Sequence, residues 1–409
     1  MTTQSVNIRY ANIRGSSTGY FVWIVILILV SAAGLLAAHT MESQGHVVTG
    51  MNNQVVWGMP HVFAIFLILT ASGVLNVASV GSVFGKAEYK PFGRLSALLA
   101  VTFLIGGLMV LVLDLGRPDR LIVAMTTYNF KSIFAWNIFL YTGFMVVVVV
   151  YLWMMFERRM QVYSRMVGIA ALTWRFILTT GTGSIFGFLV ARQAYDAAIL
   201  APMFILMSLS FGTALFILVS GAISRFTEMM VPDAMMERLK RLLGLFVMAV
   251  VYFVIVYHLA NLYIVEHQDF EKFVLLDGGV YTLLFWGVQI LIGTIIPLVL
   301  VYLKKSAQRS IVHLAAALVI IGSFAQLYVL IIGGQAYPMS LFPGKQVSSS
   351  FYDGVIASYI PSMPEVLLGI GGVSTALLIT TIAIRILPFL PERDADHIDA
   401  EPSASGESV

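Results

Sequence analysis

His61 and Asp114 are the two residues whose types and predicted positions best suit proton exchange. A neutral imidazole takes up or releases a proton near neutral pH, and a neighbouring carboxylate orients the ring and stabilises its charged form. His61 lies at the start of one long apolar run and Asp114 at the end of the next, so two antiparallel helices would bring them to the same depth. The alternative is that His61 is an interfacial residue and Asp114 only caps a turn.

The loop LDLGRPDR, residues 113–120, is the most specific local feature of the sequence. Gly116 permits a tight backbone and Pro118 fixes the next turn. Its charges alternate in sign, and Arg117 beside Asp114 would help to keep that carboxylate ionised. The alternative is a turn whose charges pair with one another and which binds no ligand.

Three further residues are candidates for binding a ligand at the same side of the membrane. Trp136 and Asn137 open an apolar run there, although a tryptophan at this place is also typical of an aromatic belt. His258 lies in the outer half of another run, near two tyrosines, and could line a site. It could equally be hydrogen-bonded within a helical bundle.

Arg175 lies near the middle of an apolar run, where a guanidinium requires a partner. Gln289 and Gln326 have similar predicted depths and are candidates for that role. Both glutamines could instead form simple hydrogen bonds between helices.

The composition indicates that lipid surrounds most of the chain. The 409 residues are 59% hydrophobic and 11% charged, whereas about 25% charged residues is usual in soluble domains. Runs of about 20 apolar residues cross a bilayer as helices, because the backbone must satisfy its own hydrogen bonds in lipid. The expected fold class is therefore all-α, a polytopic membrane helical bundle of about ten transmembrane helices. The predicted spans are 18–40, 60–84, 95–113, 132–156, 166–191, 199–223, 242–265, 280–303, 310–333 and 364–387.

The distribution of Lys and Arg predicts the orientation. Seventeen of these 24 residues lie on the side that holds both termini and six on the other, while Arg175 is within a span. By the positive-inside rule both termini are cytoplasmic. An even number of spans is consistent with this, because it places both termini on the same side. We expect a cytoplasmic N-terminal segment (1–17), a transmembrane domain of ten spans (18–387) and a disordered acidic cytoplasmic tail (388–409).

The sequence has no cysteine. Cysteine-ligated iron–sulfur clusters and covalent c-type haem are thus excluded from this chain, and any such centre must belong to a partner. The predicted outer loops 41–59, 114–131, 266–279 and 334–363 are mostly longer than the inner ones. The larger docking surface is therefore expected to face outward, which is the periplasm in a Gram-negative bacterium.

Residues 57–137 resemble the NrfD/polysulfide reductase family of quinone-interacting membrane subunits. The resemblance rests on WGMPHVFAIFLILTASG (57–73), on the LDLGRPDR loop and on YNFKSIFAWN (128–137). Outside these segments the cues are weak. The ten-span layout with cytoplasmic termini is similar to that of the DsrP branch of the family, which belongs to a membrane complex of sulfur metabolism.

The resemblance implies a quinone-binding subunit of a redox complex in the bacterial inner membrane. Such a subunit exchanges electrons between the quinone pool, menaquinone or ubiquinone, and a ferredoxin-like iron–sulfur subunit on the outer (periplasmic) face. It carries no haem or iron–sulfur cluster of its own, and cytochrome subunits can accompany it. His61 and Asp114 match the family's quinone-site residues by motif position. Lipid is a further expected partner, whereas nucleic acid is not. Whether the subunit is itself catalytic stays open.

Two other classes of protein compete with a quinone-binding subunit. A secondary transporter would be expected to show an inverted repeat and helices interrupted near mid-depth, and the sequence signals neither. A haem b cytochrome would need two axial histidines at one depth, for which His61 and His258 are the candidates.

Overall fold

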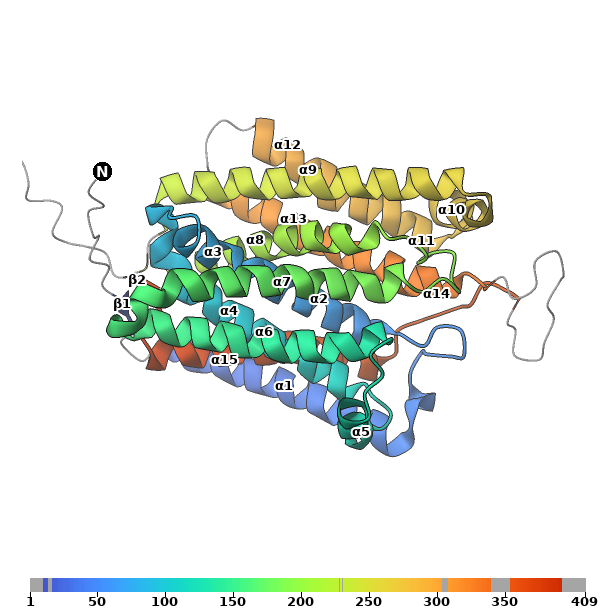
Figure 1. The fold of residues 1–409 in the computed structure, drawn as a ribbon, viewed down its shortest axis with the longest axis horizontal. Coiled ribbons are helices and arrows are strands. Elements are labelled where there is room, and N and C mark those ends of the chain that lie inside the picture. The colour runs from blue at the N-terminus through green and yellow to red at the C-terminus, as the bar shows by residue number, and fades with distance from the viewer. Residues whose placement is uncertain are drawn as a thin grey trace, which may run out of the picture.

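The computed structural model describes residues 10–13, 17–227, 229, 231–303, 308–339 and 354–391. This part of the chain is almost entirely helical, as the composition predicts. The long helices lie side by side in one bundle (Figure 1). The α-helices are α1 (Thr18–Gln44), α2 (Met59–Val74), α3 (Asn76–Ser82), α4 (Gly93–Leu113), α5 (Leu121–Thr126), α6 (Ile133–Phe156), α7 (Ser164–Gly187), α8 (Leu200–Phe226), α9 (Asp233–Tyr263), α10 (Gln268–Lys272), α11 (Val280–Leu283), α12 (Ile296–Leu303), α13 (Arg309–Tyr328), α14 (Gly334–Ala336) and α15 (Met363–Ile386).

Shorter elements connect or extend these helices. Three of them are π-helical: η6 (Phe273–Asp277), η7 (Leu284–Ile295) and η8 (Val329–Gly333). The remaining elements are the 3₁₀ turns η1 (His46–Val48), η2 (Ala87–Phe92), η3 (Pro118–Arg120), η4 (Arg158–Tyr163) and η5 (Val265–His267), and the strands β1 (Tyr10–Ala11) and β2 (Leu390–Pro391).

Nine helices within the described residues are long and apolar enough to cross a membrane. The helix α7 corresponds to the remaining predicted span, 166–191. Its 24 residues would extend about 36 Å at 1.5 Å per residue, and it packs against α6 and α8. It is less apolar because it contains Arg175 and many small polar residues. This set of long helices agrees with the predicted all-α membrane bundle.

The helix α2 lies at the centre of the bundle. It contacts α4, α8, α13 and α15, and in the span that it forms with α3 (Met59–Ser82) 94% of the most apolar stretch is buried within the protein. By contrast, α1 packs mainly on α15 and leaves most of its apolar surface exposed, as expected for a helix at the lipid boundary.

Glycines allow the central helices to approach closely. A side chain at Gly73 of α2 would overlap the backbone of Ser208 in α8, and one at Gly212 would overlap the backbone of Gly73. Small residues at such crossings are the usual means of packing helices in lipid. Within the bundle, Leu75 separates α2 from α3, so the second predicted span is slightly broken near its inner end.

The two ends of the bundle differ in what they carry. One end holds the antiparallel pair of β1 and β2, in which Tyr10 pairs with Pro391. The opposite end, which we call the distal end, holds α5, α10 and α14 (Figure 1). Both strands lie at one end because the number of long helices between them is even.

The boundary predicted at residue 388 lies a few residues too early. Phe389 and Leu390 are buried, and Phe389 packs edge-on against the ring of Phe156. Their apolar side chains thus extend the packed chain to residue 391. Most of the predicted N-terminal segment, the tail 392–409 and residues 340–353 of the last outer loop lie outside the described residues.

Candidate functional site

His61 and Asp114 lie against each other at the distal end, as predicted. The Nδ1 atom of His61 is 2.8 Å from Oδ2 of Asp114, and only 1% of the aspartate side chain is exposed. His61 is in the first turn of α2 and Asp114 caps the C-terminus of α4, so these two antiparallel neighbours bring the residues together. The contact has ion-pair distance without the alignment of a regular hydrogen bond. Such alignment often improves only when a substrate binds.

A second histidine, His46, approaches the same aspartate. Its Nε2 lies 3.0 Å from the backbone oxygen of Asp114 and 3.9 Å from Oδ1. Sequence patterns give no sign of His46, because it lies in a connecting segment with no periodicity or motif. Two imidazoles therefore surround one buried carboxylate at a helix C-terminus, where the helix dipole alone would disfavour negative charge.

The indole of Trp57 covers the imidazole of His61. Their ring centroids are 6.2 Å apart and the planes are 29° from parallel. Phe134, Phe186 and Tyr195 pack around the same indole. One face of the His61 imidazole is therefore bounded by the Trp57 indole, which these three rings hold in place.

Gln335 and Arg192 hold the segment that carries Trp57. The side-chain oxygen of Gln335 accepts hydrogen bonds from the N–H groups of Val56 and Trp57, at 3.0 and 2.9 Å. Its amide nitrogen donates to the Trp57 carbonyl at 3.0 Å. Arg192 donates to the backbone carbonyls of Gln335 and Gln54. The position of Trp57 is thus fixed by side chains remote in sequence.

Glu365 fixes the same segment from the start of α15. This side chain is fully buried and accepts hydrogen bonds from Gly50 N–H, Ser362 N–H and the Tyr359 hydroxyl. The Tyr359 hydroxyl in turn accepts a hydrogen bond from Met59 N–H. A sequence signal for Glu365 existed: Ser362 and Glu365 have the spacing of a capping box, which the structure contains.

A family model, "Polysulphide reductase, NrfD", matches residues 47–338 of the chain. This range covers well over half of the sequence and includes His61, Asp114, His258 and Gln335. The chain belongs to the NrfD family. Its helices α1 and α15 lie outside the matched range, although α15 contributes Glu365 to the distal end.

Curated relatives match this NrfD-family chain over nearly its whole length. The Hdr-like menaquinol oxidoreductase integral membrane subunit of Archaeoglobus fulgidus is 30% identical over 96% of this chain and 100% of its own length. A putative dimethyl sulfoxide reductase membrane subunit of Halobacterium salinarum is 26% identical over 90% and 91%. A selenate reductase subunit of Mesobacillus selenatarsenatis is 22% identical over 92% and 96%. All three are named as subunits, two of them as membrane subunits.

Arg117 does not contact the Asp114 carboxylate in the described part of this NrfD-family chain. It forms two hydrogen bonds with Asp119, at 3.0 and 2.9 Å, and both side chains are well exposed. This pairing lowers the pKa of the Asp119 carboxyl. Arg117 therefore fits the alternative of a turn whose charges pair with one another, because Asp119 is only two residues away. Its role in binding stays a prediction.

Trp136 and Asn137 occupy the first turn of α6. The indole of Trp136 is 45% exposed and donates to the Phe130 carbonyl, as an aromatic-belt residue does. Asn137 is buried and donates to the carbonyls of Ile133 and Gly181, which joins α6 to α7. Within the described residues neither contacts His61, although Phe134 of the same turn contacts Trp57.

His258 belongs to a separate cluster. Its Nδ1 lies 2.6 Å from Oε2 of Glu271, a fully buried carboxylate that also accepts a hydrogen bond from Asn261. No contact within the described residues joins His258 to the His61–Asp114 pair. Glu271 was not predicted, because it lies in a connecting segment among exposed charged residues.

Arg175 is buried in α7 with polar partners from the neighbouring span. It donates to the Ser72 carbonyl and to Oδ1 of Asn76, both at 3.3 Å, beside the break at Leu75. These two partners, Ser72 and Asn76, lie on either side of the helix break at Leu75. Neither Gln289 nor Gln326 contacts Arg175 in the described part of the chain, so the suggested link among them is not found.

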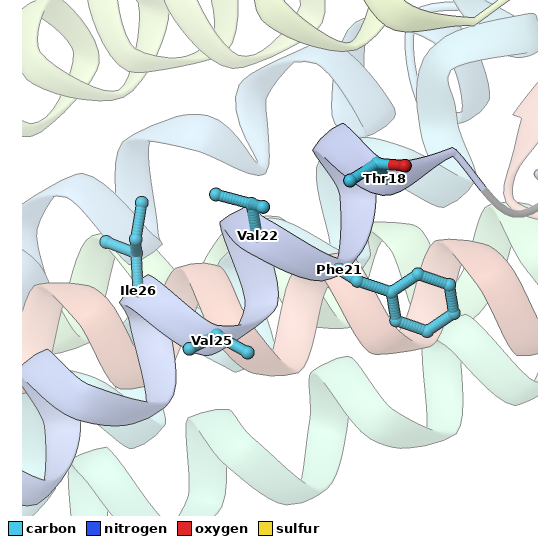
Figure 2. Close-up of a pocket in the computed structure, with 5 residues that line it drawn as sticks. All are labelled: Thr18, Phe21, Val22, Val25 and Ile26. Atoms are coloured by element: carbon cyan, nitrogen blue, oxygen red, sulfur yellow. The ribbon is translucent and has the colours of Figure 1, made fainter.

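A shallow groove of about 450 Å³ lies on α1, at the end of the bundle that carries the strand pair. Figure 2 shows its lining side chains, which are Thr18, Phe21, Val22, Val25 and Ile26. They come from one helix, and four of the five are apolar. The groove lacks a proton-exchanging group among these residues, and its place on the lipid-facing helix suits an acyl chain rather than a reaction.

Proposed function

We propose that this chain is the quinone-binding membrane subunit of a multi-subunit oxidoreductase, with its head-group site at His61 and Asp114. The observation that carries the proposal is the 2.8 Å contact between His61 Nδ1 and a carboxylate that is almost fully buried. Oxidation of a quinol releases two electrons and two protons, so its site needs a group that exchanges protons. Reduction of a quinone needs the same group in reverse.

The surrounding residues fit a quinone head group. With Nδ1 directed at Asp114, His61 has its Nε2 free of protein partners among the described residues, so this nitrogen can hydrogen-bond a quinone oxygen. Asp114 holds the ring orientation and stabilises the imidazolium when a proton arrives. The Trp57 indole offers a flat surface beside the ring. Nε2 is thus the proton-exchanging atom, and Nδ1 the oriented one.

The relatives' names support menaquinone as the quinone, because the Archaeoglobus protein is named a menaquinol oxidoreductase subunit. Electrons leaving or reaching the quinone need a partner, which we propose to be an iron–sulfur subunit. The absence of cysteine in the sequence agrees with a cluster on another chain. We propose that this partner docks on the distal end. The bias of Lys and Arg supports an orientation in which the distal end faces the outside of a prokaryotic cytoplasmic membrane.

The test is quinone-linked turnover of the assembled complex carrying His61→Gln or Asp114→Asn. Because proton transfer by a positioned side chain contributes about 10²–10⁴-fold, we expect losses of that order with the complex intact. His39→Ala provides a matched control, since His39 is an exposed histidine in the distal half of α1. Unchanged turnover in both site variants would show that the quinone site lies elsewhere in the protein.

A further inference from the structure

A second histidine–carboxylate pair lies at the distal end, between α9 and α10. His258 of α9 directs Nδ1 at Glu271 of α10, at 2.6 Å. Asn261 donates to the other carboxylate oxygen at 2.9 Å, and its own oxygen lies 3.1 Å from Nδ1 of His267. The exposed fraction is 0% for Glu271 and 1% for Asn261. Each oxygen of the Glu271 carboxylate is therefore held by a hydrogen bond, which is more than the Asp114 carboxylate has.

This pair repeats the arrangement at His61. Each histidine lies within the distal part of a long helix and turns Nδ1 toward a buried carboxylate. Each is also bounded by an aromatic ring: Trp57 covers His61, and the edge of Phe285 meets His258 with centroids 4.8 Å apart. Both imidazoles keep a small exposed fraction, 20% and 15%. Each of the two pairs therefore has an oriented imidazole that could exchange a proton with a ligand.

His258 belongs to α9, a helix that leaves most of its apolar surface exposed. Its Nε2 has no hydrogen-bond partner among the described residues, and the side chain is not fully buried. Leu259, the next residue, and Trp286, which packs on Phe285, are 59% and 50% exposed, on the surface that lipid would cover. An imidazole nitrogen without a partner is costly at such a boundary. A lipid-borne molecule with a hydrogen-bonding oxygen would offset that cost.

The helices around this pair are irregular in a way that suits a site. The π-helix η6 begins two residues after Glu271, and η7 contains Phe285. The third π-helix of the described chain, η8, ends beside Gln335, which positions Trp57. π-Helical turns are rare and frequently occur at functional sites. All three therefore adjoin one or the other histidine–carboxylate pair.

We propose that His258 and Glu271 form a second binding site for a quinone head group, entered from the lipid between α9 and η7. The proposal rests on the proposed function, because it takes the same ligand class. A quinone suits the site better than the phosphate of a lipid, since Glu271 would repel a phosphate but not a neutral ring. Phe285 and Tyr257 supply the apolar walls that such a ring needs.

The experiment is photolabelling of the assembled complex in phosphatidylcholine vesicles with an azido-naphthoquinone that carries an isoprenoid tail. Labelled peptides are located by mass spectrometry. We expect two labelled regions, one in α2 and α4 near His61 and Asp114, and one in α9 and η7 near His258 and Phe285. Unlabelled menaquinone in excess should remove both labels.

Variants then separate the two sites. His258→Gln and Glu271→Gln should each lower the α9 and η7 label about tenfold and leave the α2 and α4 label in place, whereas His61→Gln should do the reverse. His39→Ala should change neither. Phe285→Leu, which removes an aromatic wall and no polar contact, provides a further test should the Glu271 variant not assemble.

The outcomes distinguish the two proposals. Labelling at α2 and α4 alone, or α9 labelling that His258→Gln and Phe285→Leu both leave unchanged, overturns the second site and preserves the first. If the α9 label is lost in phosphatidylglycerol vesicles and excess menaquinone does not compete with it, the position binds a phospholipid. That result also overturns the second quinone site. Labelling at neither region removes the proposed function itself.

Discussion

The side chain of Gln335 forms two hydrogen bonds with the backbone of Trp57: its oxygen accepts from the Trp57 N–H at 2.9 Å and its nitrogen donates to the Trp57 carbonyl at 3.0 Å. Gln335 is 1% exposed and lies 278 positions further along the chain. Because the Trp57 indole covers His61, this amide controls where one wall of the proposed quinone site lies. We therefore propose that Gln335 is a positioning residue, which acts on the site through Trp57.

Gln335→Met should weaken quinone binding more than it weakens assembly. Loss of the amide frees the Trp57 backbone, so we expect KM for quinol to rise about tenfold with a smaller change in kcat. Gln335→Glu keeps an acceptor for the two N–H groups but loses the donor, so it should give an intermediate KM. Steady-state kinetics over a range of quinol concentrations measures this. An equal fall in assembled complex for both variants would indicate a purely structural role.

His46→Ala should cost less activity than His61→Gln. The Nε2 atom of His46 lies 3.0 Å from the backbone carbonyl of Asp114 but 3.9 Å from its carboxylate, so it supports the aspartate backbone and orients the carboxylate less than His61 does. We expect about a tenfold loss of quinone-linked turnover, against a hundredfold or more for His61→Gln. A larger loss in His46→Ala than in His61→Gln would exchange the two proposed roles.

Arg117→Ala and Asp119→Asn should leave quinone turnover unchanged at neutral pH. The two side chains pair with each other in water, and neither reaches Asp114 in the described chain. Since the pairing lowers the pKa of Asp119, its contribution to stability is present at neutral pH and is lost as pH falls through that folded-state pKa. Turnover measured in parallel with His61→Gln checks this; a comparable loss would place Arg117 in the site.

The contact between His61 and Asp114 could be predicted, because two apolar runs joined by a short loop must form antiparallel neighbours. That argument places both residues at one depth on adjacent helices, which is enough to predict that His61 lies close to Asp114. It gives no information on which remote side chains complete the site. Gln335 and Glu271 reach their partners through folded connections that leave no periodic signal, and the predicted spans did not show the break at Leu75. Glu365 could have been found from its capping-box spacing.

Glu365→Leu should lower the thermal stability of the solubilised protein. The carboxylate satisfies three donors in a buried place, and each unsatisfied buried donor costs about 1–3 kcal/mol. Glu365→Gln keeps the shape and part of the bonding, so its effect should be smaller. The exposed Glu42→Gln, also at the distal end, serves as control. Equal apparent melting temperatures for Glu365→Leu and the control would contradict the assigned contacts.

Single cysteines should report the orientation without background, because the sequence contains none. Lys86→Cys and Asp119→Cys place thiols at exposed positions on opposite ends of the bundle. In intact cells, a maleimide that cannot cross the membrane should label Asp119→Cys and should label Lys86→Cys only after lysis. The reverse pattern would place the proposed quinone site at the cytoplasmic face.

The contact between α1 and α15 has a consequence for the order in which the protein is made. Ser374 of α15 donates to the Leu27 carbonyl of α1, and Gly34 meets Gly371 with almost no space between the backbones. At roughly 5–20 residues per second, α1 leaves the ribosome some tens of seconds before α15 does. During that interval α1 has lipid or the insertion machinery in place of its main partner. Completion of synthesis is therefore the event that covers the α15-facing side of α1, and ribosome stalling before residue 363 should leave that side, around Gly34, open to crosslinking from lipid.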